Sequence, residues 1–192
     1  EKLTGKTGGN GNGTTISGTN SDNTFNLAAG DVELTNIDRF NLGNGHDTLD
    51  LSGQTADFTI NAGNHNDTVT TGSGDDTFEA AGGNNTYDSG DGNDTFNAGG
   101  GADDIDAGAD DDTVLAQKNE LLNDTLDGGD GTDEIVNENA NQALQLSGFG
   151  GGGAGNPENF EKLTGKTGGN GNGTTISGTN SDNTFNLAAG DV

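Results

Sequence analysis

Residues 72–114 read GSGDDTFEAAGGNNTYDSGDGNDTFNAGGGADDIDAGADDDTV, and the spacing within this stretch decides the fold. An apolar residue recurs at every ninth position, and an Asp or Asn stands two places before each one. The apolar residues are Phe78, Tyr87, Phe96, Ile105 and Val114. A nine-residue period matches neither the 3.6-residue repeat of a helix nor the two-residue alternation of a strand. It predicts the half-coil of a solenoid, in which a short strand is followed by a longer turn.

The same period extends beyond this stretch in both directions. Its other members are Ile16, Phe25, Val69, Leu126, Ile135, Leu144, Ile176 and Phe185, with three inserted residues before Leu126. If a coil contains two half-coils, turns that lie eighteen residues apart should stack. We therefore expect Asp76, Asp94 and Asp112 along one edge, and Asp67, Asn85 and Asp103 along the other. Inward side chains should divide in the same way, with Val69, Tyr87 and Ile105 on one sheet and Phe78, Phe96 and Val114 on the opposite sheet.

The composition excludes a conventional hydrophobic core. Of 192 residues, 37 are Gly and 26% are apolar, while 32 acidic residues face only 6 basic ones, which gives a net charge of −26. Such a chain is either disordered or a repetitive fold that needs one apolar residue per short repeat. The charge excludes nucleic acid and anionic membranes as partners and favours cations. No apolar run approaches the length of a membrane span, so we expect no membrane insertion.

The turns contain regularly placed Asp and Gly residues. The Asp residues two places before the apolar positions are Asp47, Asp67, Asp76, Asp94, Asp103, Asp112, Asp124 and Asp133. The Gly residues two places before these Asp residues include Gly74, Gly92, Gly101 and Gly131. One copy, GGDGTDEIV at 128–136, matches the complete nonapeptide pattern of a calcium-binding β-helix.

These residue types suit Ca²⁺, a hard cation that takes six to eight oxygen ligands from carboxylates and carbonyls. One turn supplies a single regular carboxylate, so two stacked turns would have to share each ion. We therefore predict an all-β chain, a β-solenoid with about 18 residues per coil and several calcium ions in the turns. Stacked carboxylates about 4.8 Å apart repel one another, so we expect the chain to be largely unfolded without calcium.

With Gly and Asp repeated at this nine-residue spacing, the chain resembles the RTX (repeats-in-toxin, haemolysin-type) calcium-binding repeat family. The matches run from Leu42 to Val136 and include GNGHDTL (43–49), GSGDDTF (72–78) and GDGNDTF (90–96). The resemblance implies a right-handed parallel β-roll with calcium in its turns. It also implies a bacterial protein that is exported by a type I system and works outside the cell or at the cell surface.

Some turns depart from the family pattern. Asn85 replaces the Asp, and His65 and Asp110 replace the fourth-position Gly. In the Ile16 and Phe25 copies the Asp position is occupied by Thr14 and Asn23. Stacked Thr and Asn side chains are expected to form hydrogen-bonded ladders there, as in other stacked β structures. The first Gly is mostly absent, being Leu42, Ala62, Thr71 or Ser89 in successive copies.

A longer repeat divides the chain. Residues 161–192 are identical to residues 1–32, so the period is 160 residues and we expect neighbouring identical units, with end-to-end assembly as a further option. Residues 1–41 are interpreted as a calcium-poor solenoid segment or a differently wound spacer, and 42–147 as the calcium-binding roll. Residues 148–158 are a Gly-rich loop or linker, and 159–192 begin the next unit. The segment Gln117 to Leu122 is the candidate for a short helix.

The favoured function is structural: a repeat of an adhesin, biofilm-matrix fibre or surface-layer protein, with no enzyme activity. Two alternatives stay open, namely an ice-binding or other ligand-binding solenoid with rows of Thr, and a calcium-dependent export region of an enzyme or toxin. His46 and His65 lie in different turns and are interpreted as turn-surface residues. No catalytic set of Ser, His and Asp stands out from the repeated carboxylates.

Overall fold

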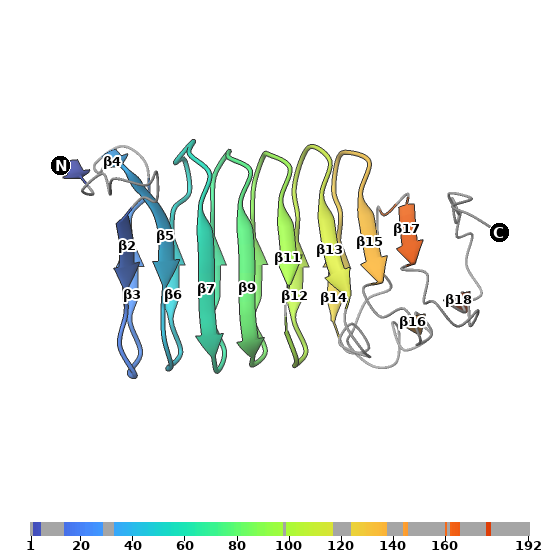
Figure 1. Cartoon of the computed structure of the whole chain (residues 1–192), viewed down its shortest axis with the longest axis horizontal. Coiled ribbons are helices and arrows are strands. Elements are labelled where there is room, and N and C mark those ends of the chain that lie inside the picture. The colour runs from blue at the N-terminus through green and yellow to red at the C-terminus, as the bar shows by residue number, and fades with distance from the viewer. Residues whose placement is uncertain are drawn as a thin grey trace.

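The structure is a computed structural model, and it describes residues 2–4, 14–28, 33–97, 99–116, 124–137, 144–145, 160, 162–165 and 176–177. Over these residues the chain is all-β, contains no helix and winds into a rod of stacked coils (Figure 1). Every strand pairing is parallel. The predicted parallel β-roll is thus confirmed.

Two parallel sheets form the long sides of the rod. The eight-stranded sheet runs in the spatial order β17 (Lys162–Gly165), β15 (Glu134–Asn137), β13 (Thr113–Ala116), β11 (Thr95–Asn97), β9 (Thr77–Gly82), β7 (Thr59–Asn64), β5 (Ile37–Asn41) and β2 (Thr14–Ser17). The six-stranded sheet runs β14 (Thr125–Asp127), β12 (Asp104–Asp106), β10 (Thr86–Asp88), β8 (Thr68–Thr70), β6 (Thr48–Asp50) and β3 (Thr24–Asn26). Two further pairs join β1 (Lys2–Thr4) to β4 (Glu33–Thr35), and β16 (Leu144–Gln145) to β18 (Ile176–Ser177).

The strand register confirms the eighteen-residue coil in the middle of the chain. Tyr87 pairs with Val69 and Ile105 in the six-stranded sheet. Phe96 pairs with Phe78 and Val114 in the eight-stranded sheet, as the nine-residue period predicts. These side chains are buried between the sheets, and the Phe78 and Phe96 rings stack with centroids 4.6 Å apart.

A second set of inward positions adds to this core. It lies two places after the apolar residue of several half-coils, and Leu42, Leu51, Ala62, Ala107 and Ala116 are fully buried there. The nine-residue count missed this set because its members vary in size and polarity. Because the side chain at this position points into the core, the first residue of the nonapeptide need not be Gly. Where the residue is polar, its hydroxyl bonds to the next coil, as Thr71 Oγ1 does to the Ser89 carbonyl at 2.9 Å.

The roll includes the segment before Leu42. Strands β2 and β5 belong to the eight-stranded sheet, and β3 belongs to the six-stranded sheet. Ile16 and Phe25 are half-buried and pack against the core. Residues 14–28 and 37–41 are therefore part of the solenoid and not a differently wound spacer, whereas β4 pairs with β1 in a separate two-stranded sheet.

The roll also continues into the next unit. Strand β17, whose first three residues repeat those of β1, pairs with β15 in a register that places Lys162 opposite Glu134 and Leu163 opposite Ile135. The Gly-rich segment 148–158 and the segment Gln117 to Leu122 both lie outside the described residues. The two copies have different neighbours. Strand β1 pairs with β4, whereas its counterpart β17 pairs with β15. Strand β2 pairs with β5, whereas its counterpart β18 pairs with β16.

Two Gly residues provide a matched test of how closely the coils stack. Gly90 has φ 89°, and a Cβ there would collide with the Gly72 carbonyl oxygen, whereas a Cβ on Gly100 would meet nothing within 4 Å. We expect Gly90→Ala to cost more than about 2 kcal/mol, because the left-handed conformation alone costs roughly 1–2 kcal/mol. Gly100→Ala should change stability by less than about 1 kcal/mol. Urea unfolding of both variants in the same buffer is the measurement, and equal midpoints would contradict the close stacking.

Candidate cation site in the stacked turns

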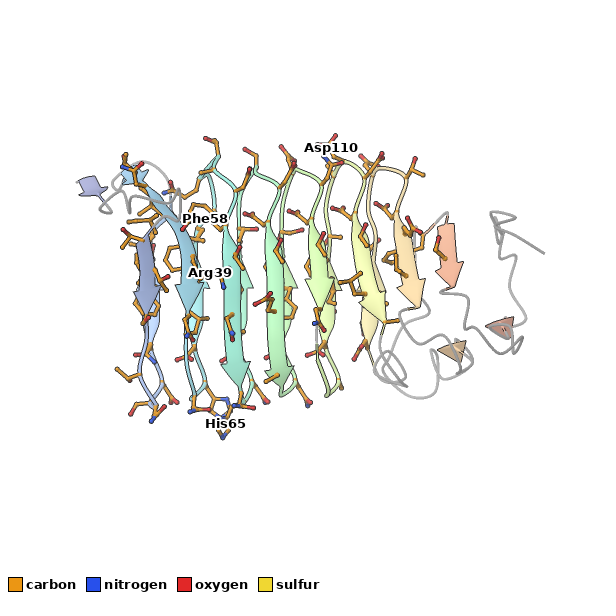
Figure 2. The ribbon with its side chains drawn as sticks, in the orientation of Figure 1. Arg39, Phe58, His65 and Asp110 are labelled. Atoms are coloured by element: carbon orange, nitrogen blue, oxygen red, sulfur yellow. The ribbon has the colours of Figure 1, made fainter. Side chains whose placement is uncertain are left out.

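The turns stack into two rows, one along each edge of the rod. The His65 edge contains the turns that end at Asn23, Asp47, Asp67, Asn85, Asp103 and Asp124. The Asp110 edge contains those that end at Phe58, Asp76, Asp94, Asp112 and Asp133. Figure 2 places the two labelled residues, His65 and Asp110, on these opposite edges. The predicted assignment of Asp67, Asn85 and Asp103 to one edge, and of Asp76, Asp94 and Asp112 to the other, is confirmed by the strand register.

The predicted Asp residues are buried. All eight are at most 1% exposed, so none of them extends into solvent. On the Asp110 edge the Asp76 N–H donates to Asp94 Oδ1 at 2.7 Å, and the Asp94 N–H donates to Asp112 Oδ1 at 2.7 Å. On the His65 edge the Asp47 N–H donates to Asp67 Oδ1 at 2.8 Å. One oxygen of each of these acceptor carboxylates is therefore used to bind the preceding coil.

The second oxygen of each of these carboxylates has no hydrogen bond. Oδ2 of Asp47, Asp67, Asp76, Asp94 and Asp112 is buried and has no hydrogen-bond partner. A buried charge of this kind is unfavourable unless a proton or a cation neutralises it. The geometry of the turns therefore requires a positive species beside these oxygens when the carboxylates are ionised.

The pKa values of these carboxyl groups reflect the same requirement. Burial raises the pKa of Asp94 to about 7, with the neighbouring Asp76 and Asp75 adding to the rise. Burial likewise raises the pKa of Asp112 to about 8, with contributions from Asp94 and Asp133. The pKa of Asp76 and that of Asp67 rise to about 6, again chiefly through burial.

Backbone oxygens at the fourth turn position complete the possible donor set. A Cβ on Gly92 (φ 120°) would collide with the Gly74 carbonyl oxygen, and one on Gly131 would collide with the Asp110 carbonyl oxygen. These carbonyls thus point along the stack toward the next turn. Within the described part of the chain, the carbonyls of Gly74, Gly92 and Asp110 accept no backbone hydrogen bond between coils. Gly101 occupies the equivalent place on the His65 edge, with φ 152°.

Carboxylate and carbonyl oxygens, without sulfur or nitrogen, are the donor set of a hard cation such as Ca²⁺. The residues therefore fit the ion that the sequence predicts. The site differs from a side-chain cage, because each turn contributes one buried carboxylate and its backbone. In the described ranges, no three His, Cys, Asp or Glu side chains gather into a group able to hold a metal ion.

Sequence reasoning missed a second row of side chains on the Asp110 edge. Each member stands one residue before a buried residue of the Asp position. This exposed row contains Asp57, Asp75, Asn93 and Asp111. Here the bonds run the opposite way, so that the Asp75 N–H donates to Asp57 Oδ1 at 3.0 Å and the Asn93 N–H donates to Asp75 Oδ1 at 2.9 Å. Asp57 thus belongs to the stacked row although no nonapeptide motif surrounds it. The eighteen-residue step from Asp75 back to Asp57 was the available signal.

In the turns that depart from the pattern, the stacked column of buried Asp side chains is interrupted. Phe58 occupies the Asp position before Asp76, is 2% exposed and ends the column on the Asp110 edge. Asn85 accepts the Asp67 N–H through Oδ1 at 3.0 Å, which leaves its Nδ2, a hydrogen-bond donor, where other coils have a second carboxylate oxygen. A cation held by those oxygens would find no ligand at Asn85 Nδ2.

An amide ladder is present, but it runs through Asn20, Asn44 and Asn64 and not through the predicted positions Thr14 and Asn23. Asn44 Nδ2 donates to Asn20 Oδ1 at 2.9 Å, and Asn64 Nδ2 donates to Asn44 Oδ1 at 2.9 Å. In the Phe25 copy, Asn23 Nδ2 donates to Asp47 Oδ1 at 2.8 Å. Neutral amides therefore also link turns that carry the buried Asp.

Comparison with protein-family models, with curated proteins and with solved structures finds no match to the chain. The RTX resemblance thus rests on the motifs of the sequence itself. In the part of the chain that the structure describes, no helix is long and apolar enough to cross a membrane.

The raised pKa values predict an acid-stabilised fold in metal-free buffer. An unfolded Asp titrates near pH 4, whereas the folded pKa values lie at about 6 to 8. Protonation therefore favours the folded chain, a contribution that is complete below about pH 4 and is lost as the pH rises through 6 to 8. In calcium-free buffer we expect more β-structure by circular dichroism, and a higher urea midpoint, at pH 5 than at pH 8. A higher midpoint at pH 8 would contradict the burial of ionisable carboxyls.

Proposed function

We propose that this chain is a structural, calcium-binding repeat of RTX type, and that calcium stiffens it into an extended rod. The observation that carries the proposal is the column Asp76, Asp94 and Asp112, whose Oδ2 atoms are buried without hydrogen-bond partners. Stacked turns with spare carbonyl oxygens lie beside this column. The eight predicted Asp residues, with the carbonyls of Gly74, Gly92, Gly101 and Gly131, are the proposed ligands of several calcium ions.

The energetic argument favours a cation over an empty column at neutral pH. Two carboxylates about 4.8 Å apart repel by on the order of 3 kcal/mol at the effective dielectric constant of a protein surface. A divalent ion between stacked turns converts this repulsion into attraction, so that its binding energy contributes to folding. Extracellular calcium modules bind in the range of about 10⁻⁴–10⁻³ M, which would keep such a chain unfolded in the cytosol and fold it after export.

The proposed setting is a tandem array on a secreted or cell-surface bacterial protein, such as an adhesin, a biofilm-matrix fibre or a surface-layer component. The identity of residues 161–192 with residues 1–32 supports this setting, and so does the pairing of β17 with β15 across the unit boundary. Each unit would then extend the rod of the unit before it, making the neighbouring copy the natural partner. We propose no enzyme activity and no nucleic-acid partner.

One observation keeps the ice-binding alternative open. Thr59, Thr77, Thr95 and Thr113 stack in register along the outer face of the eight-stranded sheet. The neighbouring outward row is interrupted by the exposed Glu79, which makes it less suited to ordering a flat layer of water. A thermal-hysteresis measurement separates the two functions, because a plain rod should give no effect. The alternative of an export region depends on whether the parent protein carries an enzyme or toxin domain.

Calcium titration followed by circular dichroism is the first test of the proposal. At pH 7.5 we expect β-structure to rise cooperatively with calcium in the range of about 10⁻⁴–10⁻³ M and to fall again when EDTA is added. Magnesium should be less effective, because it demands a smaller octahedral site and gives up its waters reluctantly. A full β spectrum that is indifferent to both calcium and EDTA would rule out the mechanism.

The substitution Asp94→Asn separates the two oxygens of one carboxylate. Its Oδ1 can still accept the Asp76 N–H, while Nδ2 replaces the oxygen available to a cation. We expect the calcium midpoint to rise at least threefold and, because a buried charge is removed, the calcium-free chain to become more stable at pH 7.5. Glu79→Gln, on an exposed side chain of β9 that pairs with the uncharged Asn61 and Asn97, is the control and should change neither quantity. Equal calcium midpoints for the two variants would contradict the assignment of Asp94 as a calcium ligand.

A further inference from the structure

The two His residues of the chain meet at the surface of the His65 edge. His46 and His65 come from adjacent turns, and their rings lie with centroids 5.8 Å apart and planes at 65°. The chain contains only these two His residues. Both side chains are exposed, and Figure 2 shows His65 projecting from its edge of the rod. The sequence interpretation of two unrelated turn-surface residues missed this pairing, because the step from position 46 to position 65 is not eighteen residues.

The hydrogen bonds of the rings fix which nitrogen is available. His46 Nδ1 lies 3.1 Å from the Asn66 carbonyl oxygen, and His65 Nδ1 lies 3.0 Å from the Asn64 carbonyl oxygen. A carbonyl oxygen only accepts, so each Nδ1 carries the hydrogen of the neutral ring. Each Nε2 then has a free lone pair, and a backbone carbonyl bonded to the opposite ring nitrogen is the usual support of a metal-binding imidazole.

The backbone at His65 is a second, independent observation. His65 has φ 79°, in the left-handed region, at the turn position where the adjacent coils have Gly45 (φ 121°) and Gly83 (φ 119°). A side chain at this position carries strain that Gly avoids. Strain retained beside a free imidazole nitrogen is typical of residues kept for binding.

We propose that His46 and His65 form a binding site for a borderline divalent metal ion of the Zn²⁺, Cu²⁺ or Ni²⁺ class, separate from the calcium sites. Imidazole nitrogen suits these ions, whereas Ca²⁺ takes oxygen ligands. Two rings that share a metal at a Zn–N distance of about 2.1 Å have centroids roughly 5 Å apart at a tetrahedral angle, and at most about 6.4 Å apart. The observed 5.8 Å lies within that range.

The acidic surroundings favour a cation at this place. Asp22 Oδ1 accepts the His46 backbone N–H at 2.8 Å, and the net charge of the chain is −26. Two protein nitrogens leave the remaining coordination positions to water or to a ligand from another molecule. The ion would clip the turn of His46 to the turn of His65, without using the buried carboxylate column.

Electron paramagnetic resonance of bound Cu²⁺ tests the proposal on the full chain. Saturating calcium is included so that oxygen sites are occupied, and one equivalent of Cu²⁺ is added at pH 7.5. We expect couplings from two imidazole nitrogens, reduced to one or none in His46→Asn and in His65→Asn. Zn²⁺ affinity by calorimetry should fall at least tenfold in each variant. Oxygen-only coordination, or a single imidazole in the native chain, would overturn the proposal.

A Gly variant separates metal loss from misfolding. His65→Gly restores the residue type that the adjacent turns use at this position, so we expect it to fold at least as stably as the native chain in urea. The spectrum of bound Cu²⁺ should nevertheless lack the coupling from the second imidazole, and Zn²⁺ affinity should fall at least tenfold. Unchanged Zn²⁺ affinity in this variant would contradict the site. The readouts count nitrogens, so they distinguish failure of this site from failure of calcium binding in the turns.

Discussion

The buried Asp at the end of each turn is the group on which the rest of this structure depends. One carboxylate oxygen accepts a backbone N–H from the preceding coil, as Asp94 does from Asp76, and thereby fixes the stacking of turns. The second oxygen is buried with nothing to bind. The same residue therefore supplies a structural hydrogen bond and an electrostatic problem, which only a proton or a cation resolves. A chain with this few apolar residues has little other stabilisation to offset that repulsion.

The variation among coils has a physical meaning in this setting. Phe58 closes one column with an apolar side chain, and Asn85 interrupts the other with an amide nitrogen. The ladder from Asn20 through Asn44 to Asn64 adds neutral hydrogen bonds between turns, two of which also carry a buried Asp. In these coils part of the cohesion between turns therefore does not depend on neutralising a carboxylate.

Continuity between units follows from the same geometry. A parallel sheet ends in an unpaired strand edge, which readily accepts another strand. Here the edge of β15 is covered by β17, whose sequence is that of the start of the next copy. Under the proposed function, an array built in this way is one long roll and not a string of separate domains, and the number of units sets its length.

The sequence by itself determined the fold class, the eighteen-residue coil, the division of inward residues such as Tyr87 and Phe96 between two sheets, and the assignment of Asp residues to edges. It could do so because strict spacing converts directly into register when coils stack. The tertiary structure alone decided that Leu42 and Leu51 are core residues, that Asp57 belongs to a stacked row, and that His46 meets His65. These features involve irregular coils or turn positions whose side-chain direction depends on how the neighbouring coil folds. Periodicity fixes which residues stack, whereas the local path of each turn fixes where its side chains point.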